Sequence, residues 1–181
     1  MTAVPATNPI HPLDEFFRRQ GRPLPAFEVV APDAIPDPYH ALLVHERDMT
    51  RTLEYFHKAA IHLRVLSRHR EAGAYCRESV LELDGSNRPV EFGAIKIHLD
   101  RFPEPGRTEI LEERRPLGGI LNASGRAYTS RPSAYLRFAA DEFIRGALLL
   151  SHAASLYGRQ NTLRDAEGQP LAEIIEILPP A

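Results

Sequence analysis

Three segments in the middle of the chain alternate between hydrophobic and polar residues, and this alternation constrains the fold more than any other feature. The segments are residues 61–67, 74–83 and 90–99. Successive side chains of a β-strand point to opposite faces, so the pattern predicts three strands that each bury one face. The turn-forming sequence Asp-Gly-Ser-Asn-Arg-Pro at residues 84–89 joins the second strand to the third. Strands joined by short turns pair in opposite directions, which predicts an antiparallel sheet.

The C-terminal part of the sequence predicts one long helix followed by two strands. Hydrophobic residues recur at helical spacing over residues 141–157, and Gly158 stands where a glycine commonly ends a helix. Short strands are predicted at residues 161–164 and 171–178, with a turn between them. Together with the central strands, this order predicts an α+β fold: a mostly antiparallel sheet with helices on one face.

Residues 40–56 also have helical spacing. The sequence Asp48-Met-Thr-Arg within them allows a second interpretation, a turn followed by a new helix from Thr50 that Asp48 caps. Residues 110–115 fit no pattern clearly, and Pro116-Leu-Gly-Gly predicts a turn or tight loop.

Eight of the sixteen prolines fall within residues 1–38, and such a density prevents long regular structure. We therefore predict a proline-rich N-terminal arm, with one short helix at residues 13–19, before a single domain over residues 39–181. The N-terminus does not resemble a signal peptide, and the longest hydrophobic run, residues 147–150, is too short to span a bilayer. We expect a cytoplasmic protein without membrane contact.

Charge excludes some classes of partner. The net charge is −2 and no basic stripe occurs, which argues against nucleic-acid binding.

None of the eight histidines belongs to a metal-binding motif, and the single cysteine, Cys76, cannot form an intrachain disulfide. We expect no metal and no cofactor. An anionic ligand would need individual arginines.

Arg77 is such an arginine. In the strand 74–83 it shares a face with Tyr75 and two leucines, which is the more hydrophobic face. An arginine that points inward needs an anionic partner, either a ligand or a buried protein carboxylate.

The last strand contains two glutamates, Glu173 and Glu176, on opposite faces. Both faces of this strand are hydrophobic, so at least one carboxyl group lies in apolar surroundings, where burial raises a pKa and suits a general acid. Counted back from the closing prolines, Glu176 stands where the family resemblance given below implies a pocket glutamate, and Glu173 is the second candidate. The alternative is a structural ion pair with Arg159 or Arg164.

Four short motifs occur in the same order as in a known family. They are Leu43-Val-His-Glu-Arg-Asp-Met-Thr50, Tyr75-Cys-Arg-Glu78, Pro116-Leu-Gly118, and Tyr157-Gly-Arg159 followed by Glu176-Ile-Leu-Pro179. Over residues 40–180 the sequence thereby resembles the chorismate pyruvate-lyases, which release pyruvate from chorismate and leave 4-hydroxybenzoate.

The resemblance implies a chorismate lyase-like fold around an enclosed pocket, a small dianionic substrate and no cofactor. Arg77 would bind a carboxylate, and Glu176 would face the ring or ether oxygen as the second catalytic residue. Backbone amides at Met49 and in Leu117-Gly118 would bind ligand oxygens. Arg159 either supports the pocket or caps a helix. Gly119 stands where the family often has arginine, so this chain lacks a positive charge that the resemblance would place near the pocket mouth.

Three functions therefore compete. The first is a lyase that forms 4-hydroxybenzoate. The second is a binding protein for an aromatic acid without catalysis; transcription-regulator domains share the fold, but the N-terminal segment leaves no room for a helix-turn-helix. The third is a related enzyme of altered specificity, such as a chorismatase that forms 3-hydroxybenzoate.

Overall fold

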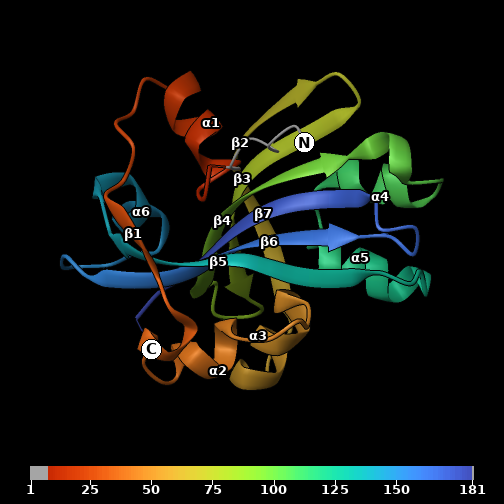
Figure 1. Ribbon diagram of the computed structural model, residues 1–181. Coiled ribbons are helices and arrows are strands. Elements are labelled where there is room, and N and C mark those ends of the chain that lie inside the picture. The colour runs from red at the N-terminus through yellow and green to blue at the C-terminus, as the bar shows by residue number, and fades with distance from the viewer. Residues whose placement is uncertain (1–7, 181) are drawn as a thin grey trace, which may run out of the picture.

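The computed structural model describes residues 8–180, and the fold is built on one antiparallel sheet. Its seven strands lie in the order β1-β5-β6-β7-β4-β3-β2, and every neighbouring pair is antiparallel (Figure 1). The strands are β1 (Phe27–Val30), β2 (Ile61–Glu71), β3 (Ala74–Leu83), β4 (Pro89–His98), β5 (Thr129–Ala139), β6 (Ser155–Arg164) and β7 (Pro170–Leu178). The predicted α+β class with a mostly antiparallel sheet is confirmed.

The central strands follow the predicted alternation. Strand β3 coincides with the predicted segment 74–83, and β4 and the longer β2 begin within one residue of prediction. Gly85 and Asn87 adopt positive φ angles of 81° and 53° in the turn that joins β3 to β4. Glycine and asparagine tolerate this left-handed conformation best, which explains why this short sequence reverses the chain.

Helices cover both faces of the sheet, so the prediction of helices on one face is wrong in this respect: both faces carry hydrophobic side chains that must be covered. Helices α2 (Tyr39–Leu43), α3 (Met49–His57), α4 (Gly106–Glu112) and α5 (Leu117–Ser124) pack on the face that carries Tyr75 and Leu81. The opposite face carries Cys76 and Val80 and packs against α1 (Leu13–Arg19) and α6 (Glu142–Ala147). Two short 3-10 helices, η1 (Pro32–Ala34) and η2 (Leu99–Arg101), complete the elements. We call the first face the pocket face.

Two predicted helix starts are confirmed. The Asp48 side chain accepts a hydrogen bond from the Arg51 backbone N–H at 2.9 Å, so α3 is a separate, capped helix. The short helix predicted at residues 13–19 is α1.

The N-terminal segment takes part in the core over its described residues. Ile10, Leu13, Phe16 and Phe17 are fully buried, and β1 pairs with β5 at the edge of the sheet (Figure 1). Residues 1–7 of the predicted arm lie outside the described residues.

The predicted helix over residues 141–157 is wrong, because α6 ends at Ala147 and residues from Ser155 onward belong to β6. The prediction took Gly158 as the residue that ends the helix. A Cβ atom added there would lie 2.4 Å from the backbone oxygen of Glu176, so this glycine permits a close approach of β6 to β7 and does not end a helix.

Two further elements differ from the prediction. Pro116-Leu-Gly-Gly is the start of α5 and not a turn, with Pro116 at the N-cap. Strand β5 has no counterpart in the prediction because only three of its eleven residues are buried and Pro132 interrupts it at a register shift.

Candidate functional site

A small cavity lies between the pocket face of the sheet and the first turns of α3 and α5. Its volume is about 60 Å³. Five of the predicted site residues line it: Met49, Arg77, Leu117, Gly118 and Glu176. The sixth, Arg159, does not line the cavity and lies beside Glu176 on β6.

Arg77 is 2% exposed, as its strand face predicts. Its Nη1 donates to the Ile110 carbonyl of α4 at a long 3.5 Å, and its Nε has no hydrogen-bond partner in the described part of the chain. Within residues 8–180 no carboxylate forms an ion pair with it. Burial lowers the pKa of Arg77, and Tyr75 and Glu113 only partly offset that effect. A buried guanidinium with so few partners is ready to receive an anion.

Arg159 is fully buried as well, but its donors are occupied. Its Nε donates to the Glu176 carboxylate. Its Nη1 donates to the carbonyls of Leu43 at 3.0 Å and His45 at 2.9 Å, and its Nη2 to the carbonyl of Arg47 at 3.2 Å. Arg159 therefore joins the sheet to the connection between α2 and α3. The alternative interpretation of Glu176, an ion pair with Arg159, is present in the structure although Glu176 also lines the cavity.

The pKa of His45 is shifted by the same buried surroundings as those of Arg159. Burial, together with the positive charge of Arg159, lowers the pKa of His45 to about 4. The imidazole is thus neutral at physiological pH and accepts or donates hydrogen bonds without adding charge near the cavity.

Glu173 lies on the opposite face of β7. It is bonded to His98 at 2.9 Å and its side chain is 25% exposed. The structure therefore places Glu176 in the cavity, the glutamate that the count from the closing prolines favours.

Glu91 is a cavity residue that our sequence analysis missed. It is 8% exposed, and its Oε2 has no hydrogen-bond partner among residues 8–180. Burial and then the neighbouring Glu176 raise the pKa of Glu91 well above its usual value, while Arg159 opposes the shift. The alternation of residues 90–99 places Glu91 on the same strand face as Ile95 and Ile97. This pattern could have identified Glu91 as an inward-facing residue.

The first turns of α3 and α5 meet over the cavity. Asp48 caps α3 through Oδ1, and its Oδ2 accepts from Asn122 of α5 at 3.3 Å. A Cβ atom added at Gly118 would lie 2.9 Å from Asp48 Oδ1 and 3.0 Å from Thr50 Oγ1. The first backbone N–H groups of a helix lack intrahelical acceptors and carry partial positive charge, so both turns favour a bound anion.

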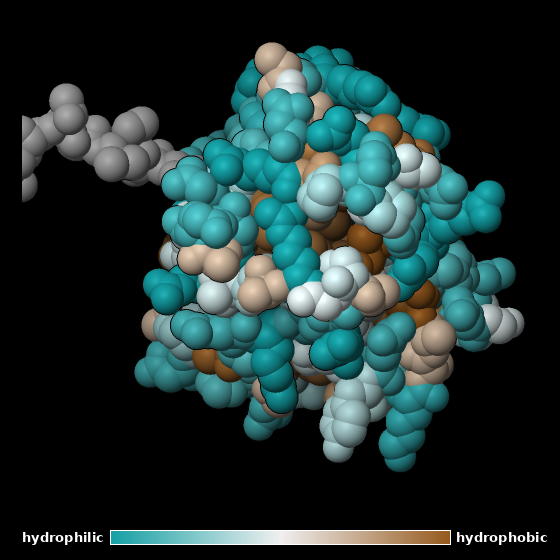
Figure 2. Space-filling model, turned by 90° about the vertical axis from the view of Figure 1, so that its right-hand side faces the viewer, coloured by the Kyte–Doolittle hydropathy of each residue, from teal (hydrophilic) through white to brown (hydrophobic). Residues whose placement is uncertain are grey.

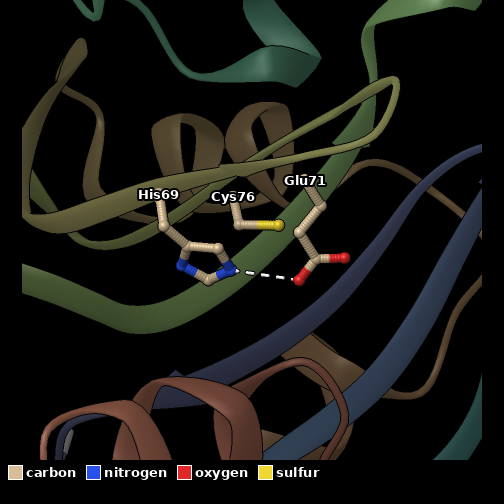
Figure 3. Close-up of side chains that lie close together, drawn as sticks. All are labelled: His69, Glu71 and Cys76. Atoms are coloured by element: carbon tan, nitrogen blue, oxygen red, sulfur yellow. Dashed lines mark hydrogen bonds and ion pairs between the residues drawn. The ribbon is translucent and has the colours of Figure 1, made fainter.

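One group of side chains has the composition of a metal site but lies on the opposite face of the sheet. The ligand atoms of His69, Glu71 and Cys76 lie within 4.8 Å of one another (Figure 3). Lys96 Nζ is already 2.9 Å from Glu71 and lowers the pKa of this glutamate to about 2. Burial raises the pKa of Cys76 to about 12, which disfavours the thiolate that a metal would need. We interpret this group as an ion-pair network.

The surface around α4 and α5 is mostly hydrophilic. Figure 2 shows this face, with hydrophobic side chains gathered chiefly in a recess near its centre. Among residues 8–180, the helices are all too short or too polar to span a bilayer.

The sequence matches no protein-family model and no curated protein sequence. Solved structures do resemble the fold. PhnF from Mycobacterium smegmatis aligns with a TM-score of 0.56 at 13% identity, over 75% of this chain and 65% of PhnF. The separate effector domain of PhnF gives 0.53 at 13% identity, over 72% of this chain and 87% of that domain.

The gene product SA0254 from Staphylococcus aureus aligns with a TM-score of 0.52 at 10% identity, over 66% of this chain and 82% of that protein. Likeness at such low identity establishes architecture and not activity. The chain has the chorismate lyase-like fold, as the sequence motifs implied.

Proposed function

We propose that the protein binds a small aromatic carboxylic acid, with the ligand carboxylate on Arg77. The observation that carries this proposal is a guanidinium 2% exposed, at a cavity, without a carboxylate partner in the described chain. Leaving such a charge unpaired costs free energy, and a carboxylate matches the donor fork of arginine in two parallel hydrogen bonds. The hydrophobic side chains of the cavity, among them Leu63 and Ile174, suit an aromatic ring.

Binding requires the cavity to open. Small-molecule sites measure roughly 300–1,000 Å³, whereas this cavity measures about 60 Å³. The sheet side is fixed by paired strands, so the first turns of α3 and α5 are the elements that move outward. A hydrogen bond of 3.3 Å links Asn122, further along α5, to Asp48 at the start of α3, and a ligand can replace it.

Calorimetric titration with benzoate and 4-hydroxybenzoate tests the proposal. Arg77→Met should weaken binding by about 2–5 kcal/mol, which is roughly 30-fold to several thousand-fold. Arg137→Met is the control, because Arg137 pairs with Glu28 and does not line the cavity. The proposal fails if the wild-type protein binds neither acid, or if Arg77→Met binds them as tightly as wild type.

A second candidate function is chorismate pyruvate-lyase activity. It is supported by the shared cavity of Arg77, Glu176, Met49 and Leu117, the residues that the family resemblance singles out. Arg77 and Glu176 lie on strands separated by β4 and differ by two residues in register, so their Cα atoms are roughly 12 Å apart. A six-membered ring fits between side chains at that separation.

In this reaction the bond between the ring and the enolpyruvyl oxygen breaks, and the proton on the adjacent ring carbon leaves. The electron pair of that C–H bond completes the aromatic ring, and the released enolpyruvate takes up a proton to become pyruvate. Glu176, positioned by Arg159, is the group assigned to accept the ring proton. Arg77 holds the ring carboxylate.

An assay with chorismate that monitors pyruvate and the aromatic product together tests the lyase. Glu176→Gln should reduce turnover by roughly 10²–10⁴ and change 4-hydroxybenzoate affinity little. Glu173→Gln is the matched control on the opposite face of the same strand. Absence of pyruvate release would leave the binding function alone, and 3-hydroxybenzoate as product would indicate the altered enzyme.

A further inference from the structure

Glu91 lies at the end of the cavity opposite Arg77. Arg77 faces Ile95 on β4, and Glu91 lies four residues from Ile95 on the same face of that strand. The Cα atoms of Arg77 and Glu91 are therefore roughly 14 Å apart, with Gly93 between them. A Cβ atom added at Gly93 would lie 3.7 Å from Glu91 Oε1, so the carboxyl group reaches back over the floor of the cavity.

Within the part of the chain that the structure describes, the Glu91 end of the cavity has two carboxyl groups and no available cation. Glu176 is a diagonal neighbour of Glu91 across β4 and β7. Arg159, the nearest cation that affects Glu91, gives its donors to Glu176 and to the carbonyls of Leu43, His45 and Arg47. A second ligand carboxylate at this end would meet negative or acidic groups without a compensating charge.

We propose that Glu91 determines ligand specificity by donating a hydrogen bond to an uncharged oxygen of the ligand. This inference rests on the first proposed function, and it names the ligand class: a monocarboxylic acid with a hydroxyl group at the end remote from its carboxylate. It argues against dicarboxylates. Chorismate carries two carboxylates, so the inference favours binding of a hydroxybenzoate over cleavage of chorismate.

Two observations support an acid that donates. Oε2 of Glu91 is buried and has no hydrogen-bond partner among the described residues, and a buried polar atom without a partner is rare in native proteins. Burial and the neighbouring Glu176 raise the pKa of Glu91, which favours its neutral form, and this form carries the proton that a hydrogen bond to a ligand oxygen needs.

The test compares benzoate, 4-hydroxybenzoate and benzene-1,4-dicarboxylate by calorimetry. Wild type should bind 4-hydroxybenzoate roughly tenfold more tightly than benzoate, the effect of one buried hydrogen bond, and the dicarboxylate least. Glu91→Met should remove the preference for the hydroxyl group, whereas Glu91→Gln, whose amide also donates, should keep it. Glu173→Gln is the control.

A second measurement needs no folded Met variant. The carbon-13 signal of the Glu91 carboxyl group, identified by its loss in Glu91→Gln, should shift when 4-hydroxybenzoate binds and stay in place with benzoate. Equal affinities for the two acids, or equal shifts, would overturn the inference while leaving aromatic-acid binding intact. If neither acid binds to wild type, the proposed function itself fails.

Discussion

Arg77 and Arg159 lie on the same face of one sheet and are both almost completely buried, yet their surroundings differ. Arg159 makes an ion pair with Glu176 and donates to three backbone carbonyls. Arg77 donates a long hydrogen bond to the Ile110 carbonyl, and its Nε has no partner among residues 8–180. Burial of a charge is equally costly at both positions, but only at Arg159 does the protein itself supply the compensation.

This difference separates Arg159, whose charge the protein itself pairs, from Arg77, for which we propose a ligand as the partner. The three carbonyls that bind Arg159 belong to α2 and the α2–α3 connection. Folding of the chain therefore supplies the hydrogen bonds that this buried charge needs. The missing partner of Arg77 must come from outside the described chain if the charge is to be satisfied. Family resemblance alone assigned both residues to the pocket and did not distinguish these roles.

The largest expected effect is on the free energy of unfolding, which should respond differently to the loss of Arg159 and of Arg77. Arg159→Met should destabilise the protein by about 3–5 kcal/mol, because it leaves the Glu176 carboxylate and three carbonyls buried without partners. Arg77→Met should change the free energy of unfolding by less than about 1 kcal/mol, since it removes a charge that the protein does not pair. Urea denaturation measures both. Equal losses in the two variants would show that Arg77 is structural too.

Glu91 and Glu176 differ in the same way as the two arginines, and we expect Glu91 to make the stability of the protein depend on pH, an effect of intermediate size. Its folded-state pKa is raised above the usual 4.5 by burial and by Glu176, with Arg159 opposing. Below pH 4.5 the folded and unfolded states are both protonated. Above it the folded state binds more protons, so the stability of wild type should fall relative to Glu91→Gln by up to about 1.4 kcal/mol per pH unit.

Denaturation of wild type and Glu91→Gln between pH 4 and pH 8 measures this difference, from which the other titrating groups largely cancel. A constant difference across that range would show that folding does not raise the pKa of Glu91. The contrast between Glu176, which is paired with Arg159, and Glu91, which is not, would then have no effect on stability.

The smallest effect concerns the helix turns above the cavity. Asp48→Ala and Asp141→Ala each remove an N-cap hydrogen bond, at 2.9 Å in α3 and 2.8 Å in α6. Each should cost about 1 kcal/mol of stability. Only Asp48→Ala should also change the affinity for 4-hydroxybenzoate, because Asp48 links α3 to α5 whereas α6 packs on the other face. Equal affinities in both variants would mean that the α3–α5 contact does not control access.

Local patterns in the sequence determined part of this protein. The alternation around Arg77 predicted both the strand and the inward face, because side-chain direction in a strand depends only on position along it. The Asp48 cap was predicted for a similar reason, since a capping residue acts within three residues of itself. The position of Glu176 relative to the closing prolines favoured it over Glu173, and the ion pair with Arg159 was the alternative interpretation of the same residue.

Only the tertiary structure decided the rest. Residues 155–157 have helical spacing, but they join β6, because sheet pairing with β5 and β7 outweighs local propensity. The distinction between Arg77 and Arg159, and the importance of Glu91, depend on partners up to 116 residues away along the chain. Such partners meet only when strand register and helix packing bring them together, and neither is encoded in the spacing of neighbouring residues.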